Sequence, residues 1–391
     1  MTFQIDAHPQ CDLINNMNWG QLACAPGQVG IWSLLEPAGE QNHAPQLCWA
    51  DDSKLVCVWM AGGQEGTSGM SIYGASLKKG QFQWSKAKLI SQSSQCSEQN
   101  PLLFRSNDGR LHLIHTAQTA RDPSDQSWKE SGQQFSMQWT AKLQHQSTKR
   151  WGARWTKSKL LIDEPAFCRN PPYKISNGRY LLPIYRSLDS SEPFADDYSQ
   201  IVELNESANA VSDPIDVPHS KGRVHGSVVL SADSSHLLQF FRSRRADRIY
   251  RSTGNLEGTG WTIPVATELP NNNSSIQALR LSNGLLAIIF NRFGIQNQSV
   301  DQDWGTAQWP RTRWPLSIAI SADDGVSWPW IRDIDYGQGF SGSANWHLNG
   351  QMAYPTILEG NANELHVAYS WGGRVAIKYV CIKINEIVGY S

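Results

Sequence analysis

The sequence has no apolar run long enough to cross a lipid bilayer. One of its longest apolar runs, at 285–290, is far shorter than the roughly 20 residues that a membrane-spanning helix needs. Positions 1–6 also lack the basic end and the apolar run of a secretory signal. We therefore expect no membrane span and a cytoplasmic protein as the chain is written, or a periplasmic or secreted one if a leader was removed.

A large net charge is also missing. The 34 Lys and Arg residues nearly balance the 35 Asp and Glu residues, which leaves a formal charge of −1. Such a chain has no global field that would attract nucleic acid or an anionic membrane. Its basic cluster at 242–251 is not interleaved with aromatic residues in the manner of a single-strand-binding surface. We therefore expect no nucleic-acid partner.

Cysteine spacing typical of a disulfide framework or a zinc site is absent as well. The seven cysteines are scattered and form no C-x-x-C motif: Cys11, Cys24, Cys48, Cys57, Cys96, Cys168 and Cys381. An odd, scattered set is typical of reduced structural thiols. The spacing therefore predicts no metal site, and we expect no cofactor.

Regular hairpins dominate what the sequence does contain. A phrase recurs in which a short strand, often with proline, is followed by a polar turn and a strongly apolar strand. Its six copies lie at 43–59, 100–115, 170–185, 225–241, 274–290 and 354–369. With 31 Gly, 17 Trp and few helical periods, this spacing predicts an all-β, six-bladed β-propeller. We expect one domain over 1–391, whose last blade is closed by a strand at about 28–35.

One turn carries a more specific pattern. The octapeptide 321–328, S-A-D-D-G-V-S-W, follows an alternating apolar strand and combines turn-forming Ser, Asp and Gly with a tryptophan that can pack beneath the turn. It resembles the Asp-box, S-x-D-x-G-x-[ST]-W, of the sialidase-like (neuraminidase) propellers with BNR repeats. From about 43 to the C-terminus the chain is similar to bacterial members of this family, which act on glycans as glycoside hydrolases.

The resemblance implies part of a sialidase site. Arg242 and Arg313 match two family arginines that bind the carboxylate of an acidic sugar. Tyr369, in an A-Y-S phrase, resembles the nucleophilic tyrosine, which avoids the repulsion that a carboxylate nucleophile would meet. Structural alternatives remain: Tyr369 in a strand core, and Arg242 within a solvated arginine-rich strand pair.

Other positions depart from the family. His43 stands where the family has its first arginine, and His225 stands where it has the glutamate that activates the tyrosine. His225 then becomes the candidate base. Glu65, on a glycine-rich loop, is the nearest counterpart of the aspartate that acts as general acid. Alternatively, the histidines are structural and Glu65 is a solvated loop acid.

Further arginines lie near strand ends of the predicted blades, namely Arg169, Arg186, Arg292 and Arg374. As a group they favour an anionic ligand, so we include them as candidate substrate-binding residues.

Three functions remain open at this point. The first is cleavage of a terminal acidic sugar, such as sialic acid, a related nonulosonate or a 3-deoxy-octulosonate. The second is a carbohydrate-binding or scaffold propeller without turnover, which the two histidine replacements favour. The third is a lyase acting on uronate polysaccharide, with Tyr369 and a histidine as base and acid.

Overall fold

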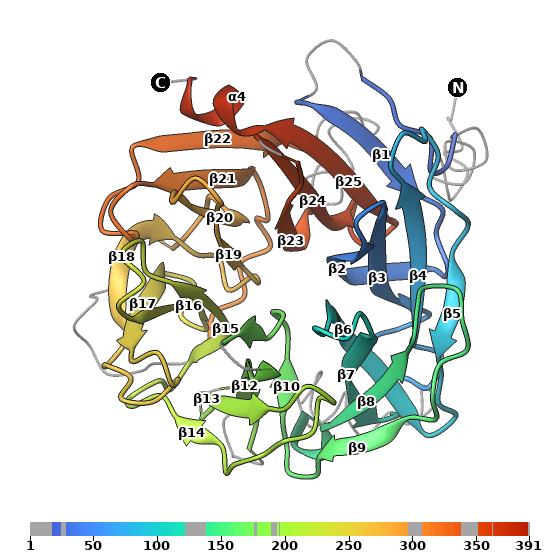
Figure 1. Cartoon of the computed structure of the whole chain (residues 1–391), viewed down its shortest axis with the longest axis horizontal. Coiled ribbons are helices and arrows are strands. Elements are labelled where there is room, and N and C mark those ends of the chain that lie inside the picture. The colour runs from blue at the N-terminus through green and yellow to red at the C-terminus, as the bar shows by residue number, and fades with distance from the viewer. Residues whose placement is uncertain are drawn as a thin grey trace, which may run out of the picture.

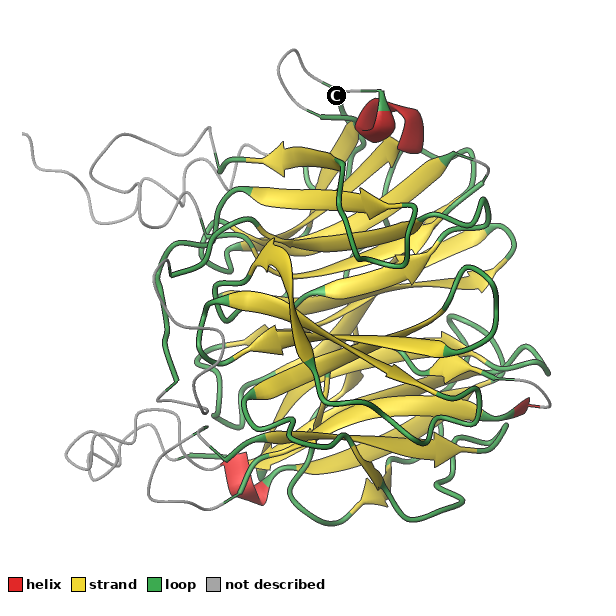
Figure 2. Cartoon of the chain, turned by 90° about the vertical axis from the view of Figure 1, so that its left-hand side faces the viewer, coloured by secondary structure: helices red, strands yellow, loops and turns green. Residues whose placement is uncertain are grey.

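The computed structural model describes residues 18–24, 29–121, 138–175, 178–188, 194, 196–295, 307–337, 351–361 and 363–389, so Cys11 lies outside it. In these residues six antiparallel sheets surround a central axis (Figure 1). The all-β, six-bladed propeller expected from the sequence is confirmed. Helix is confined to short segments such as η1 (Gln138–Thr140) and α4 (Ile384–Val388) (Figure 2). No helix of the described part is long and apolar enough to span a membrane.

The blades follow one another along the chain, each with its first strand nearest the axis. Blade 1 comprises β2 (Gln41–Asp51), β3 (Lys54–Gly62), β4 (Ser71–Lys78) and β5 (Lys88–Ser91), and blade 2 comprises β6 (Cys96–Arg105), β7 (Leu111–Thr119), β8 (Lys142–Thr148) and β9 (Lys159–Ile162). Blade 3 comprises β10 (Phe167–Cys168), β11 (Tyr173–Lys174), β12 (Tyr180–Arg186), β13 (Tyr198–Leu204) and β14 (Ile215–Asp216). Blade 4 comprises β15 (Arg223–Leu230), β16 (Leu237–Ser243), β17 (Arg248–Gly254) and β18 (Val265–Pro270), and blade 5 comprises β19 (Gln277–Arg280), β20 (Leu286–Asn291), β21 (Leu316–Ser321) and β22 (Trp330–Asp335). Blade 6 comprises β23 (Ala353–Glu359), β24 (Glu364–Trp371), β25 (Ala376–Lys383) and β1 (Ile31–Leu35).

β1 belongs to the last blade although it comes first in the chain. It pairs antiparallel with β25, and Leu35 lies opposite Ile377. Figure 1 shows this N-terminal strand running beside the C-terminal one. Because β25 then has a partner on both sides, the ring closes without an open edge at that strand.

The core lies between neighbouring blades. One buried cluster joins Leu238 and Phe240 of blade 4 to Ile288 and Phe290 of blade 5, with Trp328 beside them. Another cluster joins strands of blades 5 and 6 in the same way. A blade therefore buries its apolar faces only against its neighbours, as in other repeat architectures.

The octapeptide at 321–328 forms the turn between β21 and β22. The Ser321 hydroxyl accepts a hydrogen bond from the Gly325 amide at 2.9 Å and donates one to Asp323 at 2.7 Å. Asp323 also accepts from the Ser327 amide at 2.9 Å, and Gly325 has a φ of 79° that suits glycine. Trp328 is buried beneath the turn. The turn has the local contacts that its residue types predict.

Three carboxylates fasten a blade to the inner hairpin turn of the blade before it. Glu206 of blade 3 accepts from the Asp108 amide at 3.2 Å, and Asp324 of blade 5 accepts from the Ala232 amide at 3.0 Å. Glu359 of blade 6 accepts from the Ser282 amide at 2.9 Å. We call these three residues, Glu206, Asp324 and Glu359, the interblade carboxylates.

Four of the innermost strands carry a register shift close to the axis. The shifts lie at 43–46, 99–102, 224–227 and 353–356. Each contains a residue with positive φ: Ala44, Asn100, His225 and Tyr354, at 53°, 47°, 55° and 51°. Such bulges re-aim side chains and concentrate at functional sites. We therefore expect a functional site at the axial end of these strands.

Candidate active site

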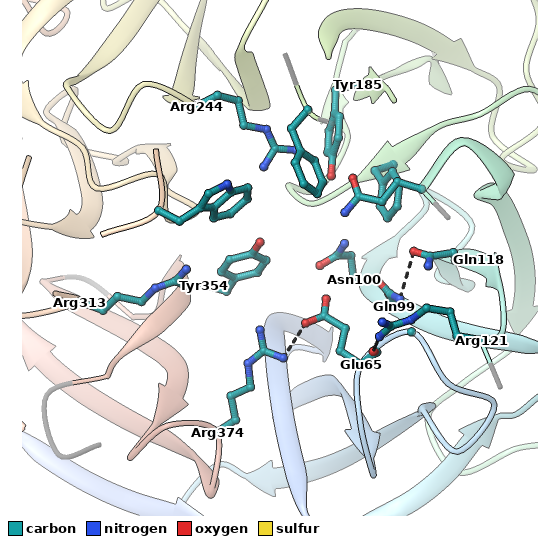
Figure 3. A pocket seen from close by; sticks show the side chains of 15 residues that line it. Glu65, Gln99, Asn100, Gln118, Arg121, Tyr185, Arg244, Arg313, Tyr354 and Arg374 are labelled. Carbon is teal, nitrogen blue, oxygen red and sulfur yellow. Dashed lines mark hydrogen bonds and ion pairs between the residues drawn. The ribbon is translucent and has the colours of Figure 1, made fainter. Parts of the chain in front are cut away.

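A cavity of about 160 Å³ opens at the axis, where all six blades contribute side chains. Its lining residues are Glu65, Gly66, Gln99, Asn100, Gln118, Arg121, Gln138, Phe167, Tyr185, Phe194, Arg244, Trp309, Arg313, Tyr354 and Arg374. Figure 3 shows Tyr354 projecting into this cavity, with Arg313 and Arg374 on the same side and Glu65 reaching toward Arg374. The cavity therefore combines an aromatic hydroxyl, a carboxylate and several guanidinium groups.

Tyr354 makes the central contact of the cavity. Its hydroxyl oxygen accepts a hydrogen bond of 2.8 Å from Nη1 of Arg242, which is fully buried. Burial by itself would raise the pKa of the Tyr354 hydroxyl, but the charges of Arg242 and Arg313 lower it below its ordinary value. The phenolate form, which is the nucleophilic form, is therefore more accessible here than on a free tyrosine.

Two buried histidines flank the Tyr354 ring. The His43 ring centroid lies 4.3 Å from that of Tyr354, and the His225 ring lies edge-on at 5.4 Å. Burial and the nearby arginines hold the pKa of both histidines well below its ordinary value, so both are neutral at neutral pH. Neither ring nitrogen of His225 has a hydrogen-bond partner among the described residues. A pKa this low makes the imidazole a weak base, so the role of His225 as the base that activates a tyrosine stays a prediction.

Three arginines bring positive charge to this part of the axis. Arg242 donates through Nε to Asn273 at 2.7 Å, and its Nη2 has no partner in the described part of the chain. Burial, with the charges of Arg242 and Arg374, lowers the pKa of Arg313 to about 10. These cations would be relieved of mutual repulsion by a bound anion.

Glu65 is held in place by two arginines. Nη1 of Arg374 lies 2.6 Å from the Glu65 carboxylate, and Nη2 of Arg121 donates to the Glu65 carbonyl at 2.5 Å. The Glu65 and Arg374 side chains are about one-third exposed to solvent, at 33% and 30%. The pair therefore lies at the mouth of the cavity, where an entering anion can compete for Arg374.

An aromatic wall covers the remaining side. Arg244 forms an ion pair of 2.5 Å with the buried Asp197. Its guanidinium carbon lies 5.0 Å from the Phe194 ring, 5.3 Å from Trp309 and 5.5 Å from Tyr185. This wall offers a ligand apolar contact rather than additional free charge.

The structure brings several sequence-predicted residues together. Glu65, Arg313 and Arg374 line the cavity, while His43, His225 and Arg242 contact Tyr354 from beneath it.

Other predicted residues lie elsewhere. The Tyr369 hydroxyl donates to Asp335 at 2.6 Å within the core between blades 5 and 6, and it is not among the cavity's lining residues. Arg186 contacts Gln200 and Glu164. Arg292 pairs with Asp333 near the surface.

Arg169 makes contacts that hold strands together. Its Nη2 donates to the backbone oxygens of Pro45, Tyr354 and Pro355 at 3.1, 2.6 and 3.1 Å. It thereby ties blade 1 to the strand that carries Tyr354.

Tyr354 was missed in the sequence, although a signal for it exists. It precedes Pro355 at the start of the sixth repeated phrase, in the same place as Asn100 before Pro101. Both residues sit in a bulge with positive φ and line the cavity. The residue that opens the second and sixth phrases, directly before proline, therefore indicates the site.

Comparisons with known proteins agree with this architecture. The BNR repeat-like domain family matches residues 53–367, which is more than half of the chain. No curated protein sequence matches significantly.

Among solved structures, a protein of unknown function from Dyadobacter fermentans has a TM-score of 0.68 at 14% identity, covering 92% of this chain and all of its own. The Hadza microbial sialidase Hz136 has a TM-score of 0.66 at 13% identity, with 89% of this chain and 66% of its own length covered. The NanB sialidase of Streptococcus pneumoniae has a TM-score of 0.65 at 12% identity, with 95% and 71% covered. This chain thus spans about two-thirds of the Hadza enzyme. The chain belongs to the BNR repeat-like family and has the propeller fold of the sialidases.

Proposed function

We propose that the protein is a glycoside hydrolase of the sialidase type that removes a terminal acidic sugar, and that the axial cavity is its active site. The observation that carries the proposal is the 2.8 Å hydrogen bond from Arg242 to the Tyr354 hydroxyl, at the base of a cavity lined by further arginines. The fold of the solved sialidases supports the same class. In this proposal Tyr354 takes the role for which the sequence pattern suggested Tyr369.

The arginines suit a carboxylate attached to the anomeric carbon. Arg242 has an unpaired Nη2, and Arg313 and Arg374 line the cavity beside Tyr354. A guanidinium binds a carboxylate through two parallel hydrogen bonds, which fixes the orientation of the sugar as well as its charge. In this proposal Arg374 takes the carboxylate-binding role of the family arginine in whose place the sequence has His43.

In the proposed reaction the Tyr354 hydroxyl loses its proton to solvent, and its oxygen forms a bond to the anomeric carbon while the bond from that carbon to the leaving oxygen breaks. The leaving oxygen takes a proton from Glu65. Water then attacks the same carbon, gives a proton to Glu65 and releases Tyr354 as the phenolate, which regains a proton from solvent.

Binding of the substrate can prepare Glu65 for its role. Glu65 is paired with Arg374 in the free protein. If the sugar carboxylate takes Arg374, Glu65 loses this partner and can turn toward the leaving oxygen. Recognition of the acidic group and supply of the proton are then linked through one contact.

The same ion pair favours a second candidate function, which is binding of an acidic sugar without turnover. In that case Glu65 stays paired with Arg374, and Tyr354 contacts the ligand without bonding to it. The arginines and the aromatic wall would still hold the ligand.

Substitution of Tyr354 tests the two functions. Tyr354→Phe removes one oxygen, so binding of sialic acid or a 3-deoxy-octulosonate should survive while hydrolysis of their aryl glycosides falls by on the order of 1,000-fold or more. Tyr369→Phe is the matched control and should retain activity. Calorimetry measures binding, and release of the aryl group measures turnover.

The alternatives give different outcomes in the same experiment. Binding without turnover in the parent protein would support the second function. Full activity of Tyr354→Phe would exclude Tyr354 as the nucleophile. Cleavage of a uronate polysaccharide that yields an unsaturated sugar, without uptake of water, would instead indicate a lyase.

A further inference from the structure

A second cluster of reactive side chains lies on blade 6, away from the axial cavity. It consists of Glu364 and His366 on β24 and Cys381 on β25. On β24, His366 is four residues from Ser370, whose hydroxyl contacts His43 beneath the cavity. At about 3.4 Å per residue, the strand carries the cluster more than 10 Å from that contact. The cluster is therefore not part of the proposed active site.

The sheet itself sets the geometry of the cluster. His366 and Cys381 are directly opposite each other in the antiparallel pair of β24 and β25. Glu364 is two residues before His366 and so points to the same face of the sheet. One ligand atom from each of the three residues lies within 4.8 Å of the others. Ligands on Zn²⁺ are separated by about 3.4–3.6 Å when metal bonds are near 2.0–2.3 Å, so a small side-chain rotation closes the set.

A neighbouring hydroxyl orients the histidine. The Tyr379 hydroxyl lies 2.6 Å from Nδ1 of His366, and the two rings are stacked with centroids 5.9 Å apart. This contact fixes the ring, and the same hydroxyl also contacts the Cys381 side chain, so Tyr379 lies beside two of the three ligands. Metal-binding histidines commonly have such a partner on the second ring nitrogen.

The cluster can be reached from solvent. Glu364 and His366 line a surface cavity of about 160 Å³ together with Trp49 and Asn361. Glu364 and Cys381 are partly exposed, while His366 is buried. Cys381 is not among the lining residues, so the cavity gives access to the cluster through Glu364 and His366.

We propose that Glu364, His366 and Cys381 form a binding site for Zn²⁺ or a similar soft divalent cation. A thiolate, an imidazole and a carboxylate are a donor set that zinc accepts in tetrahedral sites, and thiolate disfavours Mg²⁺ and Ca²⁺. Water would take the fourth position. The sequence pattern predicted no metal because these ligands are neighbours across two strands rather than along a C-x-x-C segment.

The test uses the full chain after removal of metal with a chelator. Cobalt is the spectroscopic probe, because a Co²⁺–thiolate bond gives an intense charge-transfer absorption, and displacement of cobalt by Zn²⁺ measures zinc affinity. We expect one metal per chain. Cys381→Ser should abolish the charge-transfer band, and Glu364→Gln, at a partly exposed position, should weaken Zn²⁺ binding at least tenfold. Tyr379→Phe should weaken it by about 10-fold or more through loss of the orienting contact.

Cys96→Ser is the matched control, because Cys96 is another partly exposed free cysteine. It should leave the band and the affinity unchanged, as should Cys24→Ser at an exposed thiol. A chain that binds no Zn²⁺, a band that survives Cys381→Ser, or a band lost in either control would overturn the proposal. Circular dichroism verifies that each variant remains folded.

Discussion

At the scale of the residue, Arg313 combines geometry and charge in a way that a lysine cannot copy. It lines the cavity beside Tyr354, and burial together with the neighbouring cations lowers its pKa. Arg313→Lys keeps a positive charge but replaces the two-pronged donor with a point charge. We expect binding of an acidic sugar to weaken by about 10- to 100-fold, the equivalent of one charge-assisted hydrogen bond.

Calorimetric titration with the sugar measures this change. Arg292→Lys is the control, because Arg292 pairs with Asp333 and is not among the cavity's lining residues. Equal affinity of Arg313→Lys and the parent protein for every acidic sugar that binds would remove Arg313 from the site.

Buried histidines make the stability of the protein depend on pH. Burial lowers the pKa of His112, His145 and His366 to about 4, and lowers that of His43 and His225 well below its ordinary value. Below an unfolded pKa of about 6.5, the unfolded chain therefore binds more protons than the folded one. The stability that these neutral histidines contribute is fully present above about pH 6.5. Below that pH the free energy of unfolding should decrease down to about pH 5, by up to roughly 1.4 kcal/mol per pH unit for each histidine.

Urea unfolding at several pH values measures this slope. His225→Asn removes one of these groups with a residue that tolerates a positive φ, so the slope should become smaller. Asn283→Ser, which changes no titratable group in an exposed turn, should leave the slope unchanged. A free energy of unfolding that stays constant from about pH 5 to about pH 6.5 would show that the folded histidines are protonated like free ones.

The two tyrosines of blade 6 show how far the sequence could predict the site. The repeated phrase located the blade correctly, because a hairpin is specified by local turn residues and by the alternation of apolar and polar residues along its strands. It did not distinguish Tyr354 from Tyr369, since both follow an alanine near a strand end. The difference lies in the bulge at 353–356, where one extra residue redirects a side chain. A bulge leaves no periodic pattern in the sequence, so it could not be predicted.

At the scale of the element, the interblade carboxylates act on hairpins rather than on single contacts. Asp324 accepts from the Ala232 amide and pairs with Arg280, which itself donates to the Leu230 carbonyl at 2.8 Å. The turn between β21 and β22 is thereby fixed to blade 4. Such a contact is invisible in the octapeptide pattern, which describes only the turn's internal hydrogen bonds.

Asp324→Asn tests this role. It keeps an acceptor and tolerates the positive φ of this position, but it removes the charge that Arg280 needs. We expect the free energy of unfolding to fall by about 1 kcal/mol, because the pair is only partly shielded from water. Glu257→Gln, on an exposed turn, should change it by less than about 0.5 kcal/mol. Equal stability of both variants in urea would mean that the interblade contact contributes nothing.

At the scale of the whole molecule, β1 supplies buried side chains to two parts of the core. Leu34 packs in the cluster of blades 5 and 6, and Leu35 packs in the cluster that reaches blade 1. Leu35→Ala should lower the free energy of unfolding by about 2–5 kcal/mol, as for other large-to-small changes in a core. Ile31→Ala on the same strand should have little effect, because Ile31 is 47% exposed.

Thermal or urea unfolding distinguishes the two variants. A small effect of Leu35→Ala, similar to that of Ile31→Ala, would indicate that the ring holds together without this strand.

The closure by β1 also has a consequence for the order in which the chain folds. The Asn42 side chain donates to the Val375 carbonyl across 333 positions of sequence, beside the junction of blades 1 and 6. Joining ends so far apart costs about 5 kcal/mol of chain entropy, and contacts of such long range slow folding. During synthesis β1 is made first, and it cannot pair with β25 until nearly every other blade has been made. We therefore expect the pairing of β1 with β25 to be a late step in folding.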